Sequence, residues 1–174
     1  MVDVKNCKMT KWPSSVLLER AEPIEEIGED IRALAEKMKD IMVEFKGVGL
    51  AGPQAGVGLR IFVASQDGTK ENAKVYINPE ITPSGSVVTN EEGCLSLPGI
   101  YGNIHRSSKC SIKALDLDGK EFSENGEGLL ARIFQHECDH LEGTLIKDKF
   151  STVAKIGARR KLKQLQEEYD SENE

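Results

Sequence analysis

The chain has 174 residues, of which 39% are hydrophobic and 30% charged, an ordinary composition for one globular domain with a substantial core. Its formal net charge of −6 argues against a DNA-binding protein, because binding to DNA needs a dominant basic patch. No apolar run approaches the roughly 18 residues of a membrane span, and the four cysteines form no C-x-x-C pair that would indicate a redox or zinc site.

The N-terminal segment lacks the apolar region of a signal peptide, so the sequence predicts a reduced, intracellular protein. Residues 22–45 then predict an amphipathic helix. Apolar side chains recur there at steps of four, three, four, three and four, which traces one helical face, and charged residues occupy the opposite face. The apolar positions are Ile27, Ile31, Leu34, Met38, Ile41 and Phe45.

The middle of the chain predicts β-structure. Residues 47–60 hold too many glycines for a regular helix or strand. Beyond them, β-branched or alternating apolar residues are separated by turn-forming Gly, Pro, Asn and Asp. A hairpin turn is predicted at Asp118-Gly119. The expected strands lie within residues 59–65, 74–81, 84–88 and 110–123.

Two further helices are predicted at the end of the chain. The first spans about residues 126–142, and the second begins after Ser151, a plausible N-cap. Its middle is basic, and the acidic tail at about 168–174 is expected to be frayed. The order predicts one α+β domain over residues 1–174, with mixed or antiparallel sheets packed around a central helix, an N-terminal amphipathic helix and a C-terminal helix.

The central helix carries the pattern H-E-x-x-H, which is typical of metal-dependent hydrolases. His136 and His140 lie on one helical stripe with apolar residues, and side chains four residues apart can converge on one ion. Glu137 is rotated by about 100° from His136, so its carboxylate lies beside the ion, where it can accept a proton from water. Cys138 points away from the ion. Asp139 is expected to be a structural partner of the ligands.

The pattern leaves the third metal ligand open. The extended zinc-protease motif would need histidine at position 146, which is Ile146, so that class is excluded. Glu167 or Glu168 could serve, although both lie in a charged, solvated segment. His105 is another candidate, with a surface histidine as its alternative interpretation. Cys94 could be a thiolate ligand in a stiff loop or a small buried hydrophobic residue.

Three segments together carry a resemblance to a known family. "GVGLAGPQ" at 47–54, "EGCLSLP" at 92–98 and "QHECDH" at 135–140 resemble, in order and spacing, the three signature motifs of the peptide deformylases. The resemblance spans nearly the whole chain. It implies an enzyme that removes the formyl group from the N-terminal formyl-methionine of nascent chains and releases formate.

The resemblance also implies the site. It implies one divalent ion, usually Fe(II), with zinc, nickel or cobalt also accommodated. A pocket for the methionine side chain can be placed at Val48, Leu129 and Ile133, which could equally be ordinary core residues. The implied residues are Cys94, His136 and His140 for the metal; Glu137 for acid–base catalysis; and Gln54, the backbone N–H of Leu95, and Gly49 for the oxyanion and substrate.

The chain departs from the family pattern at two positions, and other functions remain in competition. Gly52 replaces a common alanine, and Tyr101 stands where some members have a basic residue. The competing functions are a small H-E-x-x-H zinc peptidase and a structural metalloprotein associated with ribosomes. The basic stripe of the last helix is either a solvated face or a docking surface near the ribosomal exit tunnel. The expected compartment is the bacterial cytoplasm, or an organelle after removal of a transit peptide.

Overall fold

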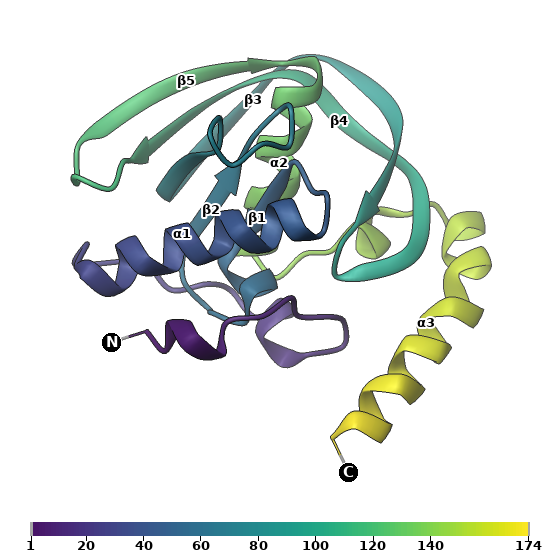
Figure 1. The fold of residues 1–174 in the computed structure, drawn as a ribbon. Coiled ribbons are helices and arrows are strands. Elements are labelled where there is room, and N and C mark those ends of the chain that lie inside the picture. The colour runs from purple at the N-terminus through teal and green to yellow at the C-terminus, as the bar shows by residue number, and fades with distance from the viewer. Residues whose placement is uncertain (1, 174) are drawn as a thin grey trace.

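One five-stranded antiparallel sheet organises the chain, and each strand pairs with the next in sequence. The computed structural model describes residues 2–173, and within them no helix is both long and apolar enough to cross a membrane. Figure 1 shows the sheet curving around one central helix. The strands are β1 (Gly49–Ala51), β2 (Ile61–Ala64), β3 (Lys74–Cys94), β4 (Leu97–Leu115) and β5 (Glu121–Glu127).

Over the described residues, three α-helices and four short 3-10 helices complete the fold, so the predicted α+β class is confirmed. The sheet is wholly antiparallel, which is one of the two arrangements expected from the sequence. The helices are α1 (Glu29–Glu44), α2 (Gly128–Leu141) and α3 (Thr152–Glu172), with η1 (Val4–Asn6), η2 (Ser15–Leu17), η3 (Gly52–Ala55) and η4 (Ile146–Lys149).

Helix α1 is shorter than its predicted range. It begins after Gly28, whose extended backbone forms the N-cap, so residues 22–28 are not helical. Four of the six predicted apolar positions are buried in the core beside β1 and β2 (Figure 1). The other two lie outside the helix. Ile27 is only partly buried, and Phe45 is 42% exposed and lines a cavity described below.

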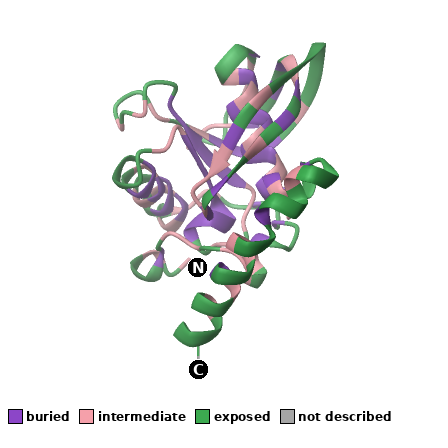
Figure 2. Ribbon diagram, turned by 90° about the vertical axis from the view of Figure 1, so that its right-hand side faces the viewer, coloured by how far each residue is buried: buried purple, intermediate pink, exposed green. Residues whose placement is uncertain are grey.

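The long hairpin of β3 and β4 extends further than the sequence predicted. The segments expected within 74–88 form one continuous strand with residues up to Cys94, and the polar stretch 101–109 is part of β4. Side chains of β4 alternate between buried and exposed from Ile104 to Ala114 in most places, as Figure 2 shows for the sheet. Glycines and register shifts between paired strands let this hairpin bend around the central helix.

Helix α2 lies inside this curved sheet. Its apolar side packs on an aromatic cluster in which the rings of Phe62 and Tyr76 stack at 4.6 Å and Phe134 meets Tyr76 edge-on at 5.1 Å. The Tyr76 hydroxyl donates to Glu124 at 2.9 Å, so its polar end is satisfied. A helix held on this rigid base can present its remaining side chains at fixed positions.

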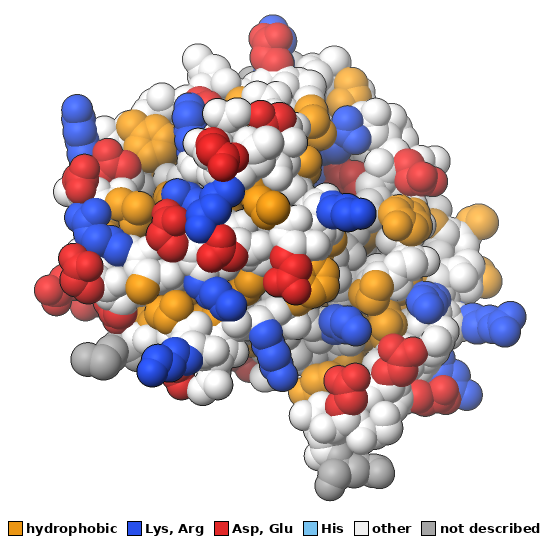
Figure 3. Space-filling model, viewed as in Figure 1, with side chains coloured by type: hydrophobic (Ala, Val, Ile, Leu, Met, Phe, Trp, Pro, Cys, Tyr) orange, Lys and Arg blue, Asp and Glu red, His pale blue; other side chains and the backbone are white. Residues whose placement is uncertain are grey.

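Helix α3 lies mainly outside the core. The predicted N-cap is present, since the Ser151 hydroxyl accepts a hydrogen bond from the amide of Ala154 at 3.3 Å. Only Ala158 and Leu165 are buried, and the helix projects from the body of the protein (Figures 1 and 2). Fraying of the tail at about 168–174 stays a prediction. Acidic and basic side chains are mixed over the face in Figure 3, as the moderate net charge predicts.

Candidate active site

Two turns of α2 and the end of β3 bring three predicted ligand side chains together. The Nε2 atoms of His136 and His140 lie 3.3 Å apart, and the Cys94 sulfur lies 3.3 Å from the Nε2 of His140. The donor atoms of all three lie within 4.8 Å of one another. Burial lowers the pKa of His140 well below its usual range, so this imidazole stays neutral and keeps the lone pair that a metal ligand needs.

These distances fit a metal ion. Bonds of about 2.0–2.3 Å at tetrahedral angles separate nitrogen and sulfur ligands by roughly 3.3–3.6 Å. The observed separations of 3.3 Å fall at the lower end of that range. Among residues 2–173, these three residues form the one cluster of histidine, cysteine and acidic side chains that could hold an ion. With three protein ligands, such a centre keeps an open position for water or substrate.

The ring of His136 is oriented by a buried ion pair. Its Nδ1 donates to the Glu92 carboxylate at 3.1 Å, which turns its Nε2 toward the other two ligands. Arg106 donates to both oxygens of Glu92, at 3.0 and 2.9 Å, and also pairs with Asp139. Burial would raise the pKa of Glu92, but the hydrogen bonds from His136 and Arg106 outweigh it and hold that pKa at about 2.

Glu137 is buried beside this cluster, and its Oε2 atom has no hydrogen-bond partner among residues 2–173. Burial raises the pKa of Glu137 to about 7, although the charges of His136 and Arg106 oppose the rise. Gly49 leaves room for this carboxylate, since a Cβ at position 49 would lie 2.5 Å from its Oε1. A side chain at position 49, the first residue of β1, would therefore collide with Glu137.

A cavity of about 650 Å³ opens over the cluster. Its wall includes Cys94, His136 and Glu137 together with the three residues predicted for a methionine pocket. Among these, Ile133 is 4% exposed and Leu129 44%, so they lie at different depths. The same wall contains Gly49, Gln54, Leu95, Val48, Ile133 and Leu129.

Gln54 and Leu95 lie beside the ligand cluster. The Gln54 side-chain oxygen accepts a hydrogen bond from the Ala51 amide at 3.0 Å, and its Nε2 donates to the Ser96 hydroxyl at 3.3 Å and lies 3.6 Å from the Cys94 sulfur. Leu95 occupies the turn between β3 and β4. Both residues line the cavity beside the Cys94 sulfur.

Comparisons with known proteins agree with this geometry. The family model for polypeptide deformylase matches residues 6–155. The chain belongs to the polypeptide deformylase family. A peptide deformylase of Thermodesulfovibrio yellowstonii is 42% identical over 158 residues, covering 90% of this chain and 96% of the relative. One of Pseudomonas aeruginosa is 43% identical over 153 residues, covering 87% and 91%.

The fold agrees as well. A crystal structure of peptide deformylase from Plasmodium falciparum matches with a TM-score of 0.90 and 39% identity, covering 94% of this chain and 98% of that one. The resemblance seen in the three motifs is confirmed, and the chain is an enzyme of the deformylase type that acts on formylated nascent peptides. The comparisons do not favour the small zinc peptidase.

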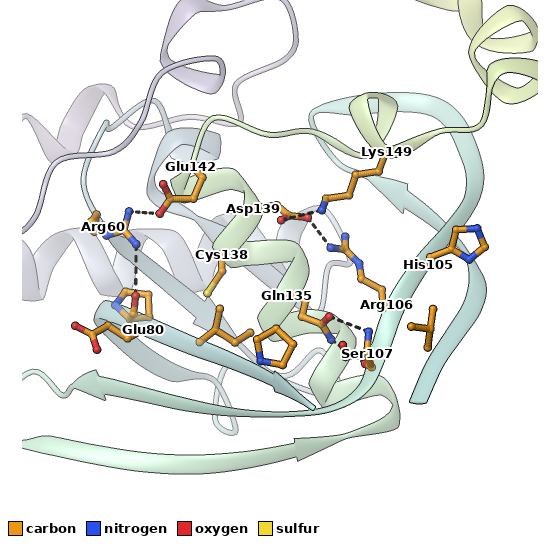
Figure 4. A pocket seen from close by; sticks show the side chains of 14 residues that line it. Arg60, Glu80, His105, Arg106, Ser107, Gln135, Cys138, Asp139, Glu142 and Lys149 are labelled. Atoms are coloured by element: carbon orange, nitrogen blue, oxygen red, sulfur yellow. Dashed lines mark hydrogen bonds and ion pairs between the residues drawn. The ribbon is translucent and has the colours of Figure 1, made fainter. Parts of the chain in front are cut away.

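The other candidate ligands lie elsewhere in this deformylase. His105 is exposed and contacts the Thr89 hydroxyl through its Nδ1 at 2.7 Å. Glu167 pairs with a lysine on α3, and Glu168 accepts a hydrogen bond there. Cys138 lines a second cavity of about 570 Å³ on the reverse side of α2, which Figure 4 shows. The prediction that Cys138 points away from the metal ligands agrees with this placement.

The structure accounts for one of the two departures from the deformylase pattern and shows where the other lies. A Cβ at Gly52 would lie 2.6 Å from the carbonyl oxygen of Leu59 and 2.9 Å from that of Val57, so the alanine common in the family would force the backbone to move. Tyr101 is 66% exposed and lines the mouth of the cavity against Gly93. The positive charge that some members place at the Tyr101 position is absent there.

Arg106 is the site residue that the sequence did not predict. It is 4% exposed and joins the Glu92 carboxylate, which holds His136, to Asp139 of the H-E-x-x-H helix. The expected role of Asp139 as a structural partner agrees with this contact. The only sequence signal for Arg106 is its spacing two residues after Ile104, which in a strand puts it on the same inward face as that apolar residue.

Proposed function

We propose that residues 1–174 act as one catalytic domain that hydrolyses the formamide bond of formyl-methionyl peptides with the metal held by Cys94, His136 and His140. The single observation that carries this proposal is the open, three-ligand cluster beside the unpartnered oxygen of Glu137. When bound, a divalent metal lowers the pKa of water toward about 7 and polarises the formyl oxygen. Water and formyl-peptide are consumed, and formate and a free amine are released.

Glu137 moves the proton. A carboxyl group whose pKa is raised to about 7 by burial can accept a proton from the attacking water near neutral pH and return it to the leaving amine nitrogen. Its unpartnered Oε2 is the atom assigned to this transfer. A buried carboxylate oxygen without a hydrogen-bond partner costs free energy. The presence of Glu137 at this position therefore supports a role in the reaction.

The negative charge that develops on the formyl oxygen has two protein donors in this proposal, the Gln54 side-chain amide and the Leu95 backbone amide. The three hydrogen bonds and contacts around Gln54 restrict its rotation before substrate arrives. Fixed donors stabilise developing charge without the cost of reorganisation. The methionine side chain is assigned to the part of the cavity lined by Val48, Leu129 and Ile133.

The remainder of the peptide can pair with the free edge of β1, the outermost strand of the sheet, at Gly49. Main-chain hydrogen bonds to a strand edge do not depend on the side chains of the peptide. An enzyme that meets many different nascent chains needs this tolerance. The bacterial relatives support the cytoplasm of a bacterium as its compartment.

Formate release from formyl-Met-Ala, measured beside amine release from unformylated Met-Ala, tests the reaction. We expect formate from the first peptide and no cleavage of the second. Cleavage of Met-Ala would instead support a peptidase. A preparation lacking formate release with any divalent metal would contradict the proposal.

The proposed native ion is Fe(II), as the family resemblance implies. A centre with a thiolate ligand and Fe(II) is sensitive to oxygen, whereas nickel at the same ligands is not readily oxidised. Activity of the iron-loaded protein should therefore decay in air while that of the nickel-loaded protein persists. Equal decay with both ions would count against Fe(II), and metal analysis after anaerobic purification would identify the ion directly.

A second proposal concerns α3, for which ribosome docking near the exit tunnel is the candidate role. Val153 and Ile156 are 80% and 54% exposed on this helix, beside basic side chains at 155, 159, 160 and 163. Exposed apolar residues among cations suit an RNA-rich surface better than a purely solvated face does. Co-sedimentation with ribosomes should be lost on deletion of residues 151–174, and survival of binding would contradict the proposal.

A further inference from the structure

Cationic side chains surround the mouth of the active-site cavity. Lys11, Lys46 and Arg132 line it, with the carboxylate of Glu91 as the exposed opposing charge. Among residues 2–173, none of these three cations forms an ion pair, whereas many surface cations elsewhere are paired. The mouth is therefore locally positive in a chain whose net charge is −6.

Each cation comes from a different, anchored part of the fold. The amide of Trp12 donates to the carbonyl of Ser96 at 3.0 Å, which fixes the neighbouring Lys11 near the turn between β3 and β4. Arg132 lies on α2 one turn before His136. The backbone positions of Lys11 and Arg132 are thus fixed by hydrogen-bonded elements, and both side chains line the same cavity.

Lys46 occupies an unusual backbone conformation. It follows α1 with a φ of 57°, in the left-handed region where glycine or asparagine is favoured. A lysine in this conformation costs about 1 kcal/mol of conformational free energy relative to an ordinary right-handed conformation. Glycine, as at the next position, Gly47, adopts it without that cost. The unfavourable conformation places a positive charge on the cavity wall, which points to a role for that charge.

The basic side of α3 reaches the same opening. Gly99 lines the cavity, and a Cβ at that position would lie 3.1 Å from Cε of Lys161. Within the described part of the chain, Lys161 also forms no ion pair with an acidic side chain, and its Nζ donates to the Gln164 side chain at 3.2 Å. A fourth cation thus lies at the outer edge of the mouth, on the side where β4 meets α3.

We propose that this positive mouth makes the enzyme prefer formyl-methionyl peptides with an acidic second residue over those with a basic one. The inference rests on the proposed function, because it assumes that methionine fills the inner cavity and the next residue lies at the mouth. Partly solvated charges act over several ångströms and are weakened by salt. Three to four unpaired cations should separate glutamate from lysine by roughly three- to tenfold in kcat/KM at low ionic strength.

Three peptides test the proposal: formyl-Met-Glu-Ala, formyl-Met-Gln-Ala and formyl-Met-Lys-Ala. Glutamine matches glutamate in shape without its charge. We expect kcat/KM to fall in the order Glu, Gln, Lys, and the Glu-to-Lys ratio to approach one in about 0.5 M salt, where the Debye length is only a few ångströms. Formate release is the readout in each case.

Variants then locate the charges responsible. Lys46→Gln and Arg132→Gln should each lower the Glu-to-Lys ratio by roughly twofold. Lys120→Gln removes the same charge from the exposed turn between β4 and β5, and should leave the ratio unchanged. Because the ratio compares substrates on one protein, a partial loss of folded enzyme in a variant cancels.

The possible outcomes distinguish failure of this inference from failure of the proposed function on which it rests. A Glu-to-Lys ratio of one or less in the unsubstituted enzyme would overturn the inference, as would a ratio that neither salt nor the mouth variants change. In both cases the peptides are still deformylated, so the proposed function stands. Failure to release formate from any of the three peptides would instead contradict the proposed function itself.

Discussion

Helix α2 separates two cavities of similar size that differ in chemistry. On one side lies the active-site cavity of about 650 Å³, and on the reverse side the cavity of about 570 Å³ drawn in Figure 4. The reverse cavity is rich in charged and polar groups, but they satisfy one another. Arg60 donates to Glu142 at 2.7 Å, Arg106 pairs with Asp139, and the Gln135 amide bonds both ways to the backbone of Ser107.

Among residues 2–173, two buried polar atoms around the metal-ligand cluster have no protein partner. The Glu137 Oε2 and the His140 Nδ1 are buried and unpaired among residues 2–173, and three ligand atoms converge on one point. Buried polar groups normally find partners, so unpaired ones indicate an external ligand or a catalytic role. The two cavities therefore differ little in volume, and what distinguishes the active side is its buried polar atoms that lack hydrogen-bond partners among residues 2–173.

The largest expected effect is the loss of Glu137. Glu137→Ala removes the proposed proton acceptor and should lower kcat by at least about 10³-fold, while the three proposed metal ligands should still bind the ion. Glu142→Ala, at the C-cap of the same helix and in the wall of the reverse cavity, is the matched control and should keep turnover within about twofold. Formate release and metal content measure both. Near-normal turnover of the Glu137 variant would show that the unpartnered carboxylate does not mark the catalytic side of α2.

The next effect concerns the oxyanion donors. Gln54→Ala deletes a side-chain amide that is already held in place, and the loss of one such donor typically costs 10²–10³-fold in rate, roughly. We expect the loss mainly in kcat, with KM nearly unchanged, because the oxyanion exists only in the transition state. A variant in which only KM rises would show that Gln54 binds substrate and has no selective effect on the reaction.

Arg106 connects the two sides, so its replacement should affect stability as well as the site. Arg106→Ala leaves the buried carboxylate of Glu92 and the nearby Asp139 uncompensated, which typically costs about 3–5 kcal/mol when one partner of a buried pair is removed. Urea unfolding should show this as a lower free energy of unfolding. A loss below about 1 kcal/mol would mean that water or a neighbouring group replaces the arginine.

Removal of the metal should have a smaller effect on stability. A ligand that binds only the folded state stabilises it according to its concentration and affinity. A chelator should therefore lower Tm by several degrees, and added zinc or nickel should restore it. In Cys94→Ala, whose third ligand is missing, the chelator-induced change should shrink sharply. An unchanged response in that variant would show that another group holds the ion.

The sequence predicted the elements whose pattern is local. The helical spacing of α1 and the H-E-x-x-H turn of α2 need only neighbours along the chain. The segment 101–109 was not recognised as a full strand because Arg106 occupies an inward position, where the alternating pattern calls for an apolar side chain. Its partners, Glu92 and Asp139, lie 14 and 33 residues away.

The site shows the same limit. Cys94 is 46 residues from His140, so the residues alone left it open against His105 as the third ligand, and the family resemblance decided between them. The contact between Gly49 and Glu137 likewise depends on how β1 and α2 pack, which no local pattern encodes. Long-range packing therefore limits what spacing can predict, both for the strand and for the site.

Cys138 gives the smallest expected effect and the sharpest control on the comparison. It lies between two metal ligands in sequence, yet its side chain faces the reverse cavity. Cys138→Ala removes one buried atom and should cost about 0.5–1.5 kcal/mol of stability, the range for small deletions in a core. Because no group on the active side changes, kcat and metal content should stay the same. A drop in either would mean that the reverse cavity is coupled to the reaction after all, and that its self-satisfied polar groups are part of the catalytic machinery.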